Sequence, residues 1–151
     1  LPIWLTFNFY DKYKSRKFHF NNIKPGTFID DIIKGHAYHV VFDGCNKVST
    51  IEKLHKGSYY ENFFIGDDPT KWKSEVSNYH QLFYRELYTN IDYEILTSVT
   101  NVKYNFHVKP GGNPNEIKLH YEGIENVQLK KGVLLIKPEV NELFEQKPYA
   151  Y

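Results

Sequence analysis

The segment Val102-Lys103-Tyr104-Asn105-Phe106-His107-Val108 alternates apolar side chains at even positions with polar side chains at odd positions. A β-strand with one buried face and one solvated face has this period of two. The run ends at Pro110-Gly111-Gly112-Asn113-Pro114, which can continue neither a β-ladder nor a helix. The alternation resumes at Ile117–Tyr121, so we expect the two segments to pair as neighbouring strands around this loop.

A second hairpin is predicted closer to the C-terminus. Val127–Leu129 leads into Lys130-Lys131-Gly132, and the apolar run Val133–Ile136 follows directly. Gly132 can adopt the positive φ that a three-residue or bulged hairpin requires. We therefore expect these two short runs to form an antiparallel pair.

Similar runs, separated by turn residues at spacings of about 8–12 residues, predict a mostly antiparallel sheet. These further strands are expected at Thr6–Tyr10, His36–Phe42, Lys47–Ile51, Tyr59–Ile65, His80–Leu87, Tyr93–Thr97 and Val140–Glu145. Helix is sparse: short helices are expected only at Thr27–Lys34 and Pro69–Asn78, and Asn21–Lys34 has the weakest pattern, typical of an exposed loop. The predicted fold class is all-β, a mostly antiparallel β-sandwich or barrel-like sheet with little helix. We expect residues 1–151 to form a single β-rich domain that lacks flanking strands at both ends.

The composition supports this fold class and excludes several functions. Aromatic residues make up 17% of the chain, methionine is absent, and Ala37 and Ala150 are the only alanines, which opposes a helical bundle. The formal net charge is +1 and arginine occurs only at positions 16 and 85, so we expect no nucleic-acid partner. No apolar run reaches the length that spanning a bilayer needs, so no membrane span is expected. Cys45 stands alone, which excludes an internal disulfide and a cysteine-based zinc site.

Candidate metal sites are weak. His36 and His39 lie three residues apart on a predicted strand and therefore point to opposite faces. His107 and His120 lie on the polar faces of the two strands expected to pair, where they could meet, but a third ligand is missing. The Gly66–Pro69 loop contains two aspartates, which leaves calcium binding open beside ordinary turn chemistry.

Catalytic motifs are absent. Carboxylates are plentiful, as in Asp92 with Glu94, but the sequence places no pair across a cleft. There is no nucleophile-elbow pattern, no His-Glu-x-x-His and no glycine-rich phosphate loop. We therefore expect no catalytic residues, no cofactor and no enzymatic activity.

Aromatic residues crowd one third of the chain: Tyr59, Tyr60, Phe63, Phe64, Trp72, Tyr79, Phe83, Tyr84 and Tyr88. Alternate positions of a strand face inward, so most of these rings are expected in the core. Rings on a solvent-facing surface would instead stack on sugars or contact a partner protein. The candidate binding surface consists of Tyr59, Tyr60, Trp72 and Tyr79, and Trp72 between two lysines is the best candidate for an exposed ring.

Several stretches together resemble an uncharacterised β-rich domain found near the N-terminus of large secreted Bacteroidota cell-surface proteins. The resemblance is carried by Gly57–Trp72 (GSYYENFFIGDDPTKW), Tyr84–Asp92 (YRELYTNID), Lys103–Gly112 (KYNFHVKPGG) and Glu145–Tyr151 (EQKPYAY), and His36–Gly44 matches a preceding strand. Thr89-Asn90 stands where such domains often have Pro-Gly. In these proteins the domain commonly precedes SBBP repeats, PKD-like modules and a C-terminal domain for type 9 secretion.

The resemblance implies export to the cell surface and a non-catalytic scaffold in an adhesin or gliding-associated protein. The expected function is therefore a structural or interaction module that binds adjacent modules or a surface partner. The alternative is a carbohydrate-binding β-sandwich with exposed rings around Tyr59, Trp72 and Tyr79, and a β-sandwich glycosidase is a more distant third. If flanking strands are missing, open sheet edges should be covered by another chain, and the isolated piece should dimerise or aggregate.

Overall fold

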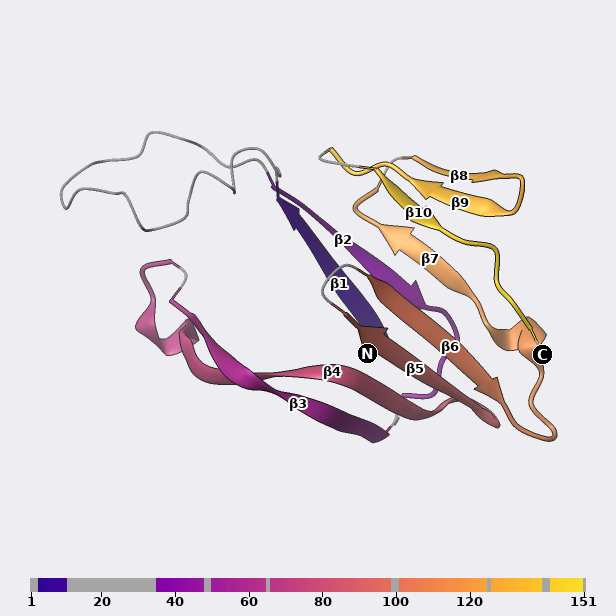
Figure 1. Cartoon of the computed structure of the whole chain (residues 1–151), viewed down its shortest axis with the longest axis horizontal. Coiled ribbons are helices and arrows are strands. Elements are labelled where there is room, and N and C mark those ends of the chain that lie inside the picture. Colours follow the sequence, from indigo (N-terminus) through magenta and orange to yellow (C-terminus); the bar gives the residue numbers. More distant parts are fainter. Residues whose placement is uncertain are drawn as a thin grey trace. The chain divides into compact units, whose positions relative to one another are not determined.

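The computed structural model describes residues 3–10, 35–47, 50–64, 66–98, 101–124, 126–139 and 142–150. The predicted helix Thr27–Lys34 and the weak stretch Asn21–Lys34 lie outside these residues. The described strands are β1 (Ile3–Tyr10), β2 (Gly35–Phe42), β3 (Thr50–Phe63), β4 (Lys73–Tyr88), β5 (Ile91–Thr97), β6 (Val102–Val108), β7 (Leu119–Glu122), β8 (Val127–Lys130), β9 (Val133–Ile136) and β10 (Leu143–Glu145) (Figure 1). Two short 3-10 turns, η3 (Pro69–Lys71) and η4 (Pro114–Glu116), are the only helical elements among the described residues. The all-β, antiparallel prediction is confirmed.

The chain divides into two compact units. Unit 1 contains Asp43–Lys118, and unit 2 contains Ile3–Phe42 and Leu119–Tyr151. Unit 1 holds one sheet, ordered β3-β4-β5-β6, and unit 2 holds two, ordered β1-β2-β7 and β10-β9-β8. All strand pairs are antiparallel, and none of the three sheets closes into a barrel.

Unit 2 is organised around a small aromatic and aliphatic core. Tyr38 and Val40 of β2 and Ile136 of β9 are buried together. Tyr38 stacks on Phe7 of the neighbouring strand with ring centroids 5.2 Å apart. Alternate residues of β2 thus face this core, as the period-two pattern of His36–Phe42 predicts.

The predicted hairpin of β8 and β9 is confirmed, with a tighter turn than expected. Lys130 pairs directly with Val133, which leaves a two-residue turn at Lys131 and Gly132. Both residues have positive φ, 51° and 81°, the combination that matches the twist of a two-residue hairpin. Glycine adopts this conformation freely, whereas Lys131 is strained in it.

The sheet of unit 1 has one apolar and one polar face. Tyr84, Tyr93 and Phe106 lie side by side across three strands, and their register places them on the same face. Tyr93 contacts both neighbours, with ring centroids 5.8 Å from Tyr84 and 5.0 Å from Phe106. The next row on the polar face contains Phe83, Glu94 and Asn105.

Two predictions for the middle of the chain are wrong. The predicted helix Pro69–Asn78 is only the turn η3 followed by the first half of β4. The strands predicted separately at Lys47–Ile51 and Tyr59–Ile65 overlap one 14-residue strand, β3, at residues 50–51 and 59–63, and Val48, Ser49 and Ile65 lie outside the described residues. Both errors fall where the strands are exposed on both faces, so the sequence lacks the alternation that signals a strand.

The expected pairing around the Pro110–Pro114 loop is also wrong. β6 pairs with β5, and β7 pairs with β2 in another sheet. β7 alternates half-buried and exposed residues as predicted, whereas β6 is exposed except at Asn105 and Phe106. Alternation specifies which face is buried and not which strand is the neighbour.

Candidate binding surface

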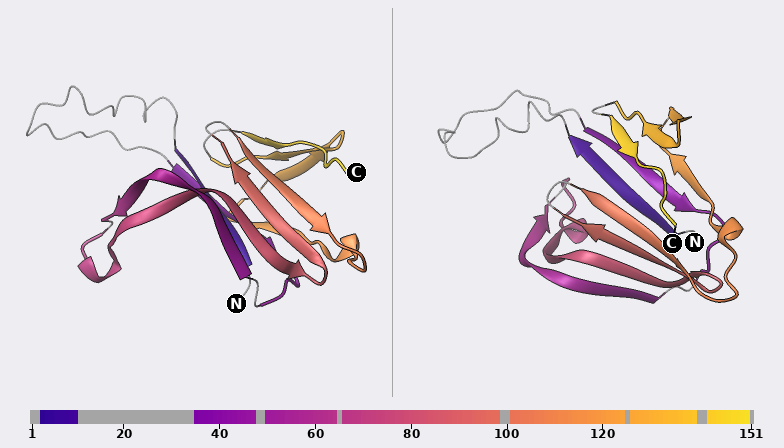
Figure 2. Two further views of the ribbon diagram at one scale, coloured as in Figure 1. Left: turned by 60° about the horizontal axis from the view of Figure 1, so that its bottom comes forward. Right: turned by 45° about the vertical axis from the view of Figure 1, so that its right-hand side comes forward.

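The outer half of the β3–β4 hairpin is a two-stranded ribbon. β5 pairs with β4 only at residues 81–88, whereas β3 pairs with β4 over the full length from Thr50 to Phe63. The part beyond this point, which we call the outer ribbon, comprises residues 56–63, η3 with its flanking loop, and residues 73–79 (Figure 2). Among the residues that the structure describes, no third strand pairs with the outer ribbon, and most of its side chains are exposed.

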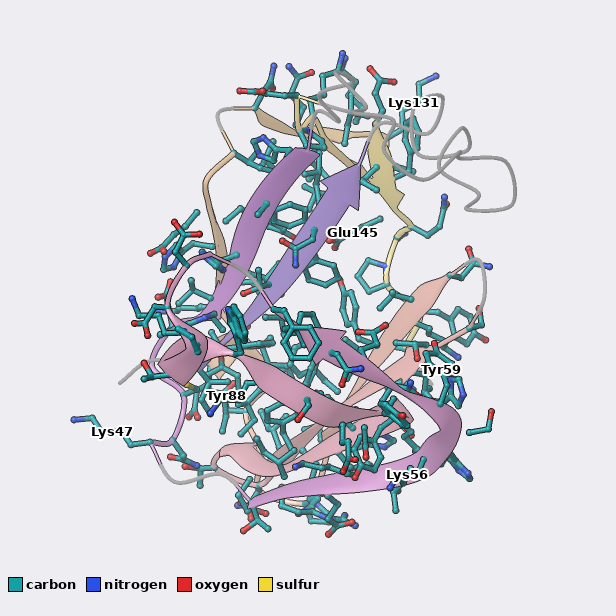
Figure 3. The ribbon with its side chains drawn as sticks, turned by 90° about the vertical axis from the view of Figure 1, so that its left-hand side faces the viewer. Lys47, Lys56, Tyr59, Tyr88, Lys131 and Glu145 are labelled. Atoms are coloured by element: carbon teal, nitrogen blue, oxygen red, sulfur yellow. The ribbon has the colours of Figure 1, made fainter. Side chains whose placement is uncertain are left out.

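The outer ribbon carries most of the exposed rings of unit 1. Tyr59 is 59% and Tyr60 60% exposed, and successive strand residues point to opposite faces. Phe63, Phe64 and Trp72 are exposed as well. Figure 3 labels Lys56 and Tyr59, which lie near the middle of β3.

The four predicted binding residues therefore separate into two groups. Tyr59, Tyr60 and Trp72 are exposed, whereas Tyr79 is partly buried, with Lys53 Nζ 5.8 Å from its ring centroid. Tyr84 and Tyr88 of the same aromatic run are buried, as expected for core rings. The aromatic run thus divides between exposed rings and core rings at about the point where β5 begins to pair with β4.

Side-chain hydrogen bonds hold the ribbon in shape. Asn78 donates from Nδ2 to the carbonyl of Tyr59 over 2.8 Å, and Asn62 accepts the N–H of Glu75 at 2.9 Å. Glu75 has a φ of 54°, so Asn62 stabilises a left-handed bulge residue. A Cβ on Gly57 would lie 1.7 Å from Oδ1 of Asn78, so any larger residue there would force the Asn78 side chain to shift.

The loop at the end of the ribbon is an ordered turn. Asp68 accepts from the backbone N–H and the hydroxyl of Thr70, at 3.1 and 2.7 Å, and caps η3. Trp72 donates from its indole nitrogen to the carbonyl of Gly66 and meets Phe64 edge-to-face at 5.5 Å. Across the part of the chain that the structure describes, no group of three or more His, Cys, Asp or Glu side chains could hold a metal ion.

A pocket of about 360 Å³ lies on one face of the ribbon. Its lining combines the ring of Tyr60 with two hydroxyl groups and one charge of each sign. The lining residues are Lys56, Gly57, Ser58, Tyr59, Tyr60, Glu75 and Ser77.

The polar side of the unit 1 sheet contains a charged network around Asp92, whose side chain is almost completely buried. Its carboxylate accepts the N–H of Glu86 at 2.8 Å, Lys109 Nζ at 2.8 Å and Arg85 Nη1 at 3.3 Å. Burial raises the pKa of Asp92, but these three donors outweigh it and hold the pKa below its ordinary value. Arg85 also binds Glu52 through two nitrogens, at 2.7 and 3.0 Å.

The carboxylate of Glu94 also accepts hydrogen bonds from three side chains. Its oxygens accept from Gln81, from Asn105 Nδ2 at 2.7 Å and from His107 Nε2 at 3.0 Å. Burial raises the pKa of Glu94, and the bonds from Asn105, His107 and Gln81 more than reverse that rise. These bonds connect Glu94 of β5 to β4 through Gln81 and to β6 through Asn105 and His107.

The histidines do not form the pairs that a metal would need. His107 bonds Glu94, whereas His120, on a strand of a different sheet, lies 3.1 Å from Glu122. The condition under which His107 and His120 could meet is not fulfilled, because β6 pairs with β5 and β7 pairs with β2. His36 lies 2.8 Å from the carbonyl of Gly123, and His39 lies 2.9 Å from the hydroxyl of Thr6.

Sequence reasoning missed the network around Asp92 and the two asparagines of the ribbon. The position of Asp92 between the apolar residues Ile91 and Tyr93 could have indicated the network, because a carboxylate in a buried strand requires hydrogen-bond or ion-pair partners. Asn62 and Asn78 lie among polar residues and gave no such signal.

In the described part of the chain, no helix has the length and apolar composition needed to cross a bilayer. Comparison with curated proteins gives no match to this chain, and comparison with solved structures gives none either. A family model for a domain of unknown function, DUF7948, matches residues 4–151, a range that includes residues of both units. The chain therefore belongs to the DUF7948 family.

Proposed function

We propose that the chain is a non-catalytic interaction module of an exported cell-surface protein, of the adhesin or gliding-associated kind, and that the outer ribbon contacts a partner protein. The observation that carries this proposal is the set of exposed rings on the ribbon. Tyr59, Tyr60 and Phe64 are each about 60% exposed on a two-stranded element with no core of its own. Aromatic residues are enriched in protein interfaces, and clustered exposed rings mark such surfaces.

The non-catalytic part is supported by the state of the buried carboxylates. Asp92 and Glu94 are each held by three donors, and both pKa values are lowered. Reproducible turnover of any substrate by the purified chain, abolished by changing a residue of the ribbon pocket, would contradict this part of the proposal.

The export part is supported by the resemblance of Gly57–Trp72 and Tyr84–Asp92 to a domain of secreted Bacteroidota surface proteins. Protease treatment of intact cells that produce the full protein tests it directly. We expect the protein to be cleaved without cell lysis, while a cytoplasmic marker stays intact. Cleavage only after lysis would contradict export.

Photo-crosslinking tests the ribbon as the contact surface. A photoreactive phenylalanine analogue replaces Tyr60 or Trp72 in the full protein, and Tyr149 of unit 2, which is 85% exposed, serves as the control position. In intact producing cells, the ribbon positions should crosslink to one defined polypeptide that mass spectrometry identifies, and position 149 should not. Equal crosslinking from all three positions would contradict a dedicated surface.

Carbohydrate binding is a second candidate, favoured by the composition of the ribbon pocket. A ring beside hydroxyls, an ammonium and a carboxylate is the combination that binds a sugar by stacking and hydrogen bonding. A glycan array with wild type, Tyr60→Ala and Trp72→Ala separates this candidate from the first. Signal that is lost in the variants supports it, and an array without signal excludes it.

A further inference from the structure

The outer edge of β3 is unpaired in the part of the chain that the structure describes. β3 ends the sheet order β3-β4-β5-β6, so one side of its 14 residues faces no strand of unit 1. An exposed strand edge is a template for pairing with another chain. Lys53 favours pairing with a strand that places an acidic group opposite it.

The charges and apolar residues of β3 are complementary to those of an antiparallel copy of itself. Residues at equal distances from Gly57 would lie opposite each other when two copies meet around that glycine. Lys53 would then face Glu61, four residues to either side, and Ile51 would face Phe63, six residues to either side. Twofold symmetry repeats both pairs.

The remaining side chains fit the same register. Leu54, 40% exposed, would face Tyr60, 60% exposed, so two apolar groups that now lie in solvent would cover each other. β3 is irregular near its centre: His55 has a φ of 54°, and the register of β3 with β4 shifts between Lys56 and Tyr60. In a symmetric pair the irregular centres of the two β3 strands lie close to the twofold axis, where Gly57 adds no side chain.

We propose that β3 pairs edge to edge with β3 of a second copy of this chain, antiparallel and centred on Gly57. This pairing deepens the proposed function and rests on it, because it names a second copy as a protein partner at the ribbon. The product is a continuous sheet in the order β4-β3-β3-β4.

Charge reversal across the pair provides the test. Lys53→Glu and Glu61→Lys each place like charges opposite each other twice in the dimer, so sedimentation velocity over a concentration series should show dimerisation weakened at least about tenfold. An equimolar mixture of the two variants places opposite charges together again and should form heterodimers. The double variant K53E/E61K should self-associate like wild type, and Asp67→Lys in the loop is the matched control that should change nothing.

Circular dichroism and melting curves establish that each variant is folded. If one single variant does not fold, the double variant K53E/E61K still tests the pairing, because it restores opposite charges across the dimer. A wild-type chain that stays monomeric at all concentrations overturns the inference, as does a dimer that Lys53→Glu leaves unchanged. Crosslinks from Tyr60 to a different polypeptide, made by a monomeric chain, overturn the pairing but retain the proposed function. Crosslinks from Tyr60 to the chain itself, lost in Lys53→Glu, support both.

Discussion

Replacing Asp92 by asparagine removes the charge at the centre of the network in unit 1 and nearly preserves its shape. The carbonyl oxygen of the new side chain can still accept the N–H of Glu86, now 2.8 Å from Oδ1. The ion pairs with Lys109 and Arg85 are lost, and these two cations would face a neutral amide. Breaking a buried ion pair by changing one partner costs about 3–5 kcal/mol. Arg85 and Lys109 are 45% and 41% exposed, so water can hydrate them again once the carboxylate is gone. We therefore expect Asp92→Asn to lower the free energy of unfolding by less than this, by about 2–3 kcal/mol.

The direction of the pKa shift of Asp92 determines how the stability difference between wild type and Asp92→Asn changes with pH. The pKa of Asp92 is lower in the folded chain than in the unfolded chain, so its contribution to the free energy of unfolding is present above the unfolded pKa of about 3.9. That contribution is lost as the pH falls through the folded pKa, because the wild-type carboxylate then becomes protonated. The difference between wild type and Asp92→Asn should therefore be full at pH 7 and shrink below about pH 4.

Urea unfolding followed by fluorescence or circular dichroism, at neutral and acidic pH, measures both effects. With a slope of about 2 kcal/mol/M for a chain of this size, the midpoint at pH 7 should fall by about 1–1.5 M. Asp67→Asn in the exposed loop is the matched control and should shift the midpoint very little. The reasoning is refuted if Asp92→Asn behaves like Asp67→Asn, or if the full difference persists at acidic pH.

Three further predictions concern the ribbon and the β8–β9 hairpin. Gly57→Ala should lower the melting temperature, because its Cβ would lie 1.7 Å from Oδ1 of Asn78. Adding Asn78→Ala should recover part of this loss. An unchanged melting temperature in Gly57→Ala would contradict the clash. Lys131→Asn should stabilise unit 2 by about 0.5–1 kcal/mol in urea unfolding, because asparagine tolerates the positive φ that lysine resists. Tyr60→Ala should change the free energy of unfolding by less than about 0.5 kcal/mol, since this ring is 60% exposed, and a larger loss would place it in a core.

The sequence predicted the strands whose two faces differ. His36–Phe42 and Tyr93–Thr97 each have one more deeply buried side, and each lies within a strand of the structure. Val102–Val108 is a strand as well, but only Asn105 and Phe106 in it are half-buried, so its alternation does not match its burial. The β8–β9 hairpin was predictable as well, because Gly132 marks the turn and the flanking runs are short. These predictions succeed because burial on one face imposes a visible period on the residues.

The outer ribbon could not be predicted from its sequence in the same way. Residues 52–58 and 73–78 are exposed or half-exposed, so nothing selects apolar side chains at alternate positions. The neighbour of β7 was also beyond reach, since its antiparallel pairing with β2 joins segments far apart in the chain. The pairing of β6 with β5 is local, but alternation alone does not distinguish β5 from β7 as the neighbour. Tyr59 and Tyr60 are exposed and Tyr84 is buried because β5 pairs with β4 only from residue 81 onward. The sequence does not indicate where this pairing ends.

Hydroxyl-radical footprinting of the rings, in the purified chain and on intact producing cells, tests the interaction-module claim most directly. In the dilute purified chain, Tyr59, Tyr60 and Trp72 should be oxidised readily, as should Tyr149 of unit 2. On cells, where the partner is present, the three ribbon rings should become protected while Tyr149 remains reactive. Equal oxidation of the ribbon rings in both settings would contradict the account.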